Sequence, residues 1–109
     1  MQKRKPHYYL KKIKSLLYFE ETREVTQTSR QAAASLGYME VDDMILIIGT
    51  LTRKHFFKSM TTQYDSSLWQ DVYKIKDEAD KKLYIKLQLS PDVEKAVVVQ
   101  FKEDTGGGD

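Results

Sequence analysis

Four stretches in the second half of the chain decide the fold: HFFKSMTTQY (55–64), LWQDVYKIK (68–76), KLYIKLQL (82–89) and EKAVVVQFK (94–102). All four are rich in β-branched and aromatic residues, which favour strands. The polar segments between them have the lengths of hairpin loops. We therefore predict an antiparallel meander of these strands. A short strand around residues 23–26 is expected to join it, so the sheet should have four to six strands.

The first half of the chain predicts helices. Pro6 suits a first helical turn, and apolar residues then recur at three- and four-residue spacing, namely Tyr9, Ile13, Leu16 and Leu17. Further on, Thr28 and Gln31 have the spacing of a capping box before an alanine run, and Gly37 is placed to end that helix.

A third helix is expected over the apolar run at residues 44–48. Its periodicity alone fits a buried strand or a buried helix. Asp42 and Asp43 before the run and Gly49 after it favour a helix, because acids in the first turn and a glycine past the end are typical of helix boundaries. The chain is thus expected to have an α+β fold in which about three helices pack on one face of an antiparallel sheet.

The composition is that of a globular domain with no membrane contact. The 109 residues are 40% hydrophobic and 31% charged, which suits a single domain. We assign this domain to residues 1–103 and expect a disordered glycine-rich tail at 104–109. No stretch of about 18 apolar residues is present, and no apolar segment follows the basic N-terminus as in a secretory signal. A cytoplasmic location is therefore expected.

The residue types also exclude several kinds of site. The absence of cysteine excludes disulfides, a thiolate zinc site and a cysteine nucleophile. The only histidines are His7 and His55, so a histidine-based metal site is not expected, and no cofactor is predicted. His7 follows Pro6, and the sequence fits an acid–base role or a structural role for it equally well. His55 is interpreted as structural or surface-exposed.

Charge is distributed unevenly. Residues 1–14 carry no acid and six basic residues: Lys3, Arg4, Lys5, Lys11, Lys12 and Lys14. Such a basic arm is typical of contact with a polyanion through its phosphates, although a solvated helix face would look the same.

Strand alternation divides the predicted sheet into two faces. If the loops keep odd-numbered residues opposite odd ones, the odd face is apolar and should be the side that the helices cover: Phe57, Trp69, Tyr73, Ile75, Leu83, Ile85, Leu87, Leu89, Val97, Val99 and Phe101. The even face has no carboxylate and five lysines: Lys58, Lys74, Lys82, Lys86 and Lys102. In this register Lys58 lies opposite Lys74, and Tyr84 lies opposite Gln100.

Cations together with the amide of Gln70 and the phenol of Tyr84 suit a phosphodiester substrate. A face without Asp or Glu disfavours a two-metal nuclease. The alternative without a binding or catalytic role is a solvated sheet surface whose lysines prevent aggregation.

Several motifs resemble the MqsR family of toxin–antitoxin ribonucleases: FKSMTT (57–62), LWQDVY (68–73), LYIK (83–86) and FKE (101–103). The segment KRKPH (3–7) and the pair Ile48-Gly49 match as well, and the motifs follow in the right order from about residue 2 to 103. The resemblance implies a RelE-like α+β fold. It also implies an mRNA interferase that cleaves at short GC-containing sites and is neutralised by a cognate antitoxin.

The resemblance also implies where the site lies. The family's active-site residues carry over to Lys58, Gln70, Tyr84 and Lys102, all on the even face. We expect Tyr84 to transfer a proton, with nearby lysines lowering the pKa of its phenol, Lys58 and Lys102 to hold the phosphate, and Gln70 to orient it or a base edge. Predicted RNA contacts are Lys74 and Lys86 on this face and Arg4 and Lys11 in the basic arm, where a ribosome contact is also possible.

Two questions stay open at this stage. The even face could serve a non-catalytic module that binds nucleic acid or an acidic protein. The antitoxin could pair with an exposed sheet edge or plug the lysine face, and we expect edge pairing at the outer strand 55–64.

Trp69 is expected in the core rather than as a base-stacking platform.

Overall fold

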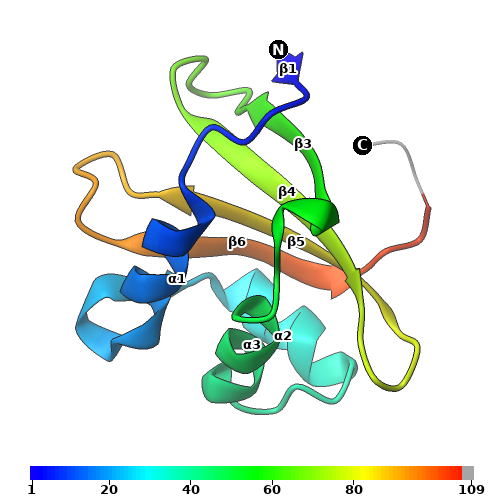
Figure 1. The fold of residues 1–109 in the computed structure, drawn as a ribbon. Coiled ribbons are helices and arrows are strands. Elements are labelled where there is room, and N and C mark those ends of the chain that lie inside the picture. The colour runs from blue at the N-terminus through cyan, green and yellow to red at the C-terminus, as the bar shows by residue number, and fades with distance from the viewer. Residues whose placement is uncertain (107–109) are drawn as a thin grey trace.

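One curved sheet forms the centre of the molecule, with strand order β1-β3-β4-β5-β6-β2 (Figure 1). The computed structural model describes residues 1–106, so half of the predicted tail, residues 107–109, lies outside the described residues. The strands are β1 (Gln2–Lys3), β2 (Arg23–Val25), β3 (Phe56–Thr61), β4 (Trp69–Lys76), β5 (Lys82–Leu89) and β6 (Ala96–Glu103). The four-stranded meander and the short strand near residue 23 are therefore confirmed.

Two features of the sheet differ from the prediction. Strand β2 runs parallel to β6, so the sheet is mixed rather than wholly antiparallel. Strand β1 pairs with β3, placing Gln2 beside Met60 and Lys3 beside Ser59. The expectation that residues 55–64 form an outer strand is therefore wrong, because the basic N-terminus covers part of that edge.

Three helices pack on one side of this sheet: α1 (Leu10–Tyr18), α2 (Gln27–Ser35) and α3 (Val41–Ile48) (Figure 1). Short 3-10 turns at Glu20–Thr22 and Arg53–His55 lead into β2 and β3. Along residues 1–106, no helix combines the length and the apolar character that crossing a bilayer requires. The predicted α+β class is confirmed.

Local capping explains the helix boundaries. Helix α3 has the expected acids in its first turn and a capping box between Glu40 and Asp43. Helix α2 begins two residues earlier than predicted, because the side chain of Thr26, not Thr28, accepts a hydrogen bond from the Ser29 amide. Gly37 ends this helix as predicted, and its φ of 97° is a conformation that glycine adopts without strain.

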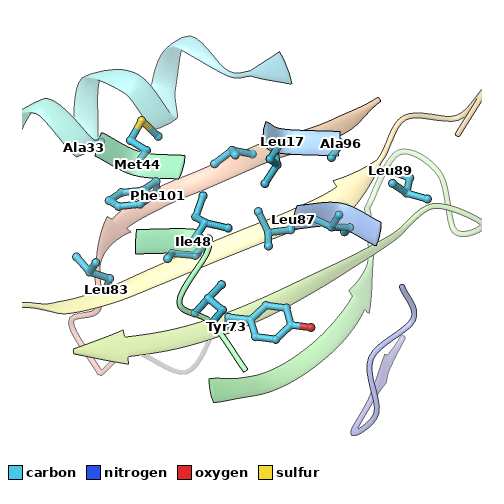
Figure 2. Packing of buried hydrophobic residues seen from close by; sticks show 14 residues of the cluster. Leu17, Ala33, Met44, Ile48, Tyr73, Leu83, Leu87, Leu89, Ala96 and Phe101 are labelled. Atoms are coloured by element: carbon cyan, nitrogen blue, oxygen red, sulfur yellow. The ribbon is translucent and has the colours of Figure 1, made fainter. Parts of the chain in front are cut away.

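Between helices and sheet lies a single apolar core (Figure 2). The helices contribute Ile13, Leu17, Ala33, Met44 and Ile48, and the strands contribute Tyr73, Leu83, Ile85, Leu87, Leu89, Ala96, Val98 and Phe101. In β6 the core residues are therefore Ala96 and Val98 rather than the predicted Val97 and Val99. A bulge between Lys86 and Leu87 shifts the β5–β6 register. Side chains in the first half of β6 therefore point to the sheet faces opposite to those predicted.

A buried carboxylate fixes the N-terminal segment to the sheet. Asp71 is fully buried and accepts hydrogen bonds from the backbone amides of His7, at 3.0 and 3.1 Å, and Tyr8, at 2.9 Å. The Ser59 hydroxyl is a third donor, at 2.6 Å. These contacts hold residues 7–8 against β4 ahead of the helix. Helix α1 consequently begins at Leu10 and not, as predicted, near Pro6.

We predict that Asp71→Asn lowers the free energy of unfolding by about 2–4 kcal/mol, because the amide turns N–H groups toward donors and removes a charge-assisted acceptor. Urea denaturation measures this. The control is Asp42→Asn, whose side chain is 82% exposed in its ion pair with Arg23 and should change stability by less than about 1 kcal/mol. Equal, small effects of both substitutions would contradict the anchoring role of Asp71.

Candidate functional site

The strand register gathers the predicted site residues on the sheet face away from the helices. Three cross-strand rows can be followed. One contains Lys74, Tyr84 and Lys102, the next Lys58, Val72, Lys86 and Gln100, and the third begins with Met60 and Gln70. We call this surface, defined by Lys58, Gln70, Lys74, Tyr84, Lys86 and Lys102, the lysine face. Six of the eight predicted site residues therefore lie together.

Two predicted cross-strand pairs are wrong. Lys58 lies opposite Val72, not Lys74, and Tyr84 lies opposite Lys102, not Gln100. Lys58 and Val72 belong to an uninterrupted register that runs from Thr61 and Trp69 at the hairpin loop, so the like-charged pair across these strands does not form. A bulge between Phe56 and Lys58 shifts the register only beyond this point. For Tyr84 the correction brings Lys102 closer than the sequence suggested.

The same bulge places Phe57 at the lysine face instead of in the core. Phe56 packs against the core in its place, and Phe57 is 41% exposed. The Lys74 ammonium lies 3.9 Å from the centre of the Phe57 ring, and the Lys58 ammonium lies 5.5 Å from it. Both distances suit cation–π contacts, so the exposed ring helps to hold two of the lysines.

Side chains of the lysine face are buried against one another. Tyr84 is 2% exposed, Lys58 7% and Lys86 8%. Lysines that only keep a sheet soluble extend into water, and lysine is rarely buried to this extent without a partner. This burial argues against the alternative that the face is an ordinary solvated sheet surface whose lysines prevent aggregation.

Three ammonium groups surround the Tyr84 ring. The Nζ atom of Lys102 lies 4.9 Å from the ring centre, and those of Lys74 and Lys86 each lie 6.0 Å from it. Positive charge this close favours the ionised form of a neighbouring acid and attracts an anion. The arrangement is therefore suited to an anion bound close to a phenol.

An amide pair lies at the end of this cluster. Gln70 is 9% exposed and donates from Nε2 to Oε1 of Gln88 at 2.7 Å. Gln88 in turn donates to the carbonyl of Leu89. Strand alternation places Gln88 on this face, two residues after Lys86, but no role was predicted for it. It fixes the orientation of the Gln70 amide.

The basic arm is only partly connected to the lysine face. Arg4 lines a cleft of about 390 Å³ together with Gln2, Lys3, Phe57 and Lys58. Lys11 is exposed on α1, which packs on the opposite side of the sheet, so the structure does not bring it to the site.

Trp69 and His7 belong to the anchor of the arm. The two rings stack with centres 5.4 Å apart, and the Lys3 ammonium lies 4.2 Å from the Trp69 ring centre. Burial, and next the charge of Lys3, lower the pKa of His7, while Asp71 opposes this effect. The His7 ring is therefore neutral near pH 7, and its contacts are those of a structural residue. Trp69 is half-buried under the arm and is not presented for base stacking.

A larger hollow of about 810 Å³ exists on the helical side, between α1 and α3. Two cations line it, but both are engaged: Arg23 pairs with Asp42, and the Lys14 ammonium donates to the Leu51 carbonyl. Within residues 1–106, no three His, Cys, Asp or Glu side chains gather as a metal site would require. The lysine face is therefore the candidate site.

Fold and site together define an α+β protein that presents a buried cluster of cations and a phenol on an open sheet face. Comparison with known proteins agrees with this class. The family described as "Motility quorum-sensing regulator, toxin of MqsA" matches residues 5–103. The chain is also 36% identical over 103 residues to the mRNA interferase toxin MqsR of Escherichia coli (strain K12), covering 94% of this chain and 99% of that relative. The chain belongs to the MqsR toxin family.

We predict that Gln88→Met lowers the free energy of unfolding by about 1–3 kcal/mol, because the buried Gln70 amide loses its acceptor. The matched control is Gln100→Met on the same face. Among residues 1–106, the Gln100 Oε1 atom is buried without a hydrogen-bond partner, so its removal should be neutral or stabilising. Chemical denaturation of both variants provides the test, and a larger loss for Gln100→Met would contradict the assignment.

Proposed function

We propose that this protein is a toxin endoribonuclease that cleaves mRNA at the lysine face by a metal-independent attack of the RNA 2′-hydroxyl. Family membership supports the class of activity. The observation that carries the assignment to this face is the burial of Tyr84 among the ammonium groups of Lys74, Lys86 and Lys102. A cluster of cations repels a divalent metal ion and binds a phosphate directly.

The reaction needs no external nucleophile. The 2′-oxygen attacks the adjacent phosphorus, the bond from phosphorus to the 5′-oxygen breaks, and the products carry a 2′,3′-cyclic phosphate and a 5′-hydroxyl. One proton must leave the 2′-hydroxyl and one must reach the 5′-oxygen. Acid–base help in such a step is worth about 10²- to 10⁴-fold, and stabilisation of the developing charge contributes a similar amount.

Different residues of the lysine face transfer protons, bind the phosphate and orient the RNA. Tyr84 is central to the cluster, and its cationic neighbours favour the phenolate. As the phenolate it takes the proton from the 2′-hydroxyl, and the phenol so formed returns a proton to the 5′-oxygen. Lys58 and Lys102, from the two strands flanking β4 and β5, hold the phosphate and stabilise its added charge. Gln70, oriented by Gln88, donates to the phosphate or to a base edge.

The same surfaces suggest which residues contact the RNA and the partner proteins. Lys74, Lys86 and Arg4 contact the RNA near the cleaved bond, while Lys11 would contact phosphates only at a distance from the site or on the ribosome. Cleavage at short GC-containing sites and neutralisation by a cognate antitoxin are proposed from the family. For edge pairing by the antitoxin, the segment of β3 that β1 leaves open is Phe56 to Lys58.

We predict that Tyr84→Phe, Lys58→Met and Lys102→Met each reduce RNA cleavage by about 10²-fold or more and abolish growth inhibition while the fold persists. Cleavage rates, growth curves and thermal unfolding measure this. Lys95→Met, on the exposed β5–β6 loop, is the matched control and should retain activity. Full cleavage by all three variants would place catalysis outside the lysine face, whereas wild-type protein that binds RNA without cleaving it would indicate a non-catalytic binding module.

A further inference from the structure

One carboxylate reaches the lysine face from just beyond β6. Asp104 Oδ2 lies 3.4 Å from the Lys74 ammonium, and the two side chains are 14% and 27% exposed. The sequence assigned Asp104 to the tail and predicted no carboxylate on this face. The structure instead fixes its backbone, because its amide donates to the Lys82 carbonyl at 2.7 Å, and the Gly106 amide donates to Asp104 Oδ1 at 3.1 Å.

The partner of Asp104 occupies a central position. The Lys74 ammonium lies 3.9 Å from the Phe57 ring centre and 6.0 Å from the Tyr84 ring centre. Since Asp104 Oδ2 is 3.4 Å from the same ammonium, it lies at most about 9.4 Å from the Tyr84 ring centre. A carboxylate and a phosphate offer the same anionic oxygens to a lysine. Asp104 is therefore placed where an RNA phosphate beside the cleaved bond would bind.

We propose that Asp104 is an internal substitute for a substrate phosphate: it occupies Lys74 in the free protein and gives Lys74 up to the RNA backbone on binding. This inference rests on the proposed function and adds a phosphate subsite with a competing carboxylate. In the free protein the carboxylate reduces repulsion among the crowded lysines. In the complex the same carboxylate weakens binding, because it is left without its partner near a phosphate.

The exchange has a distinct dependence on salt. A lysine that neutralises a phosphate of single-stranded nucleic acid normally adds about 0.7 to the slope of log affinity against log salt concentration. If Lys74 leaves Asp104 to bind the phosphate, the freed carboxylate attracts cations from solution while the phosphate releases one. The net contribution of Lys74 to the slope in the wild-type protein is therefore smaller than about 0.7.

The test measures binding of a short 2′-O-methyl oligoribonucleotide, which cannot be cleaved by 2′-oxygen attack, by fluorescence anisotropy over a series of salt concentrations. We expect Asp104→Asn to bind about 2- to 5-fold more tightly than the wild type and to have a steeper slope, by at most about 0.7. The matched control is Glu103→Gln, which removes the same charge from the neighbouring residue, opposite core residue Leu83. Its affinity and slope should stay close to those of the wild type.

A second pair of variants tests whether the effect acts through Lys74. In a Lys74→Met background, the added Asp104→Asn substitution should no longer steepen the slope, and thermal unfolding confirms that each variant is folded. If Asp104→Asn matches Glu103→Gln, binds more weakly than the wild type, or keeps its steeper slope without Lys74, this inference is overturned while the proposed function stands. If the wild-type protein neither binds the oligonucleotide nor cleaves RNA, the proposed function fails as well.

Discussion

Strand β5 is buried on both of its faces, and the rest of the molecule depends on that constraint. One set of its side chains, Leu83, Ile85 and Leu87, lies in the core beneath the helices. The alternate set, Tyr84, Lys86 and Gln88, lies on the lysine face with at most 8% exposure. Because the alternation has a period of two, a shift of one residue would move the lysine into the core and the leucines into the site. The packing of the core therefore also fixes the position of the phenol.

A cluster of lysines on one face is unfavourable in the absence of a ligand, and several contacts reduce its cost. The register of the β3–β4 hairpin places Lys58 opposite Val72 instead of another lysine. Aromatic rings of Phe57 and Tyr84 lie against the ammonium groups, and Asp104 forms an ion pair with Lys74. The long apolar stems of the lysines cover the sheet while the charges converge. A phosphate that enters this site meets cations that are already held in place.

The sequence predicted the strands, the helices and the composition of the lysine face because these features depend on local patterns of residues. Strand alternation within β4 and β5 placed Lys74, Tyr84 and Lys86 correctly. The prediction failed for Phe57 and for the first half of β6, since a bulge adds one residue without a reliable signal in the sequence. Pro6 suggested an early start for α1, whereas the distant carboxylate of Asp71 holds this segment against the sheet. Asp104 looked like part of the tail because its partner, Lys74, is far away in the sequence.

The central claim is that the lysine face catalyses attack by the RNA 2′-hydroxyl without a metal ion. The most direct measurement is the chemical identity of the ends that the purified protein produces on RNA in the presence of excess EDTA, with Tyr84→Phe measured in parallel. The account predicts 2′,3′-cyclic phosphate and 5′-hydroxyl ends from the wild-type protein, and their loss in the variant. Ends that carry a 5′-phosphate and a 3′-hydroxyl, or cleavage that stops with EDTA and returns with magnesium, would contradict it.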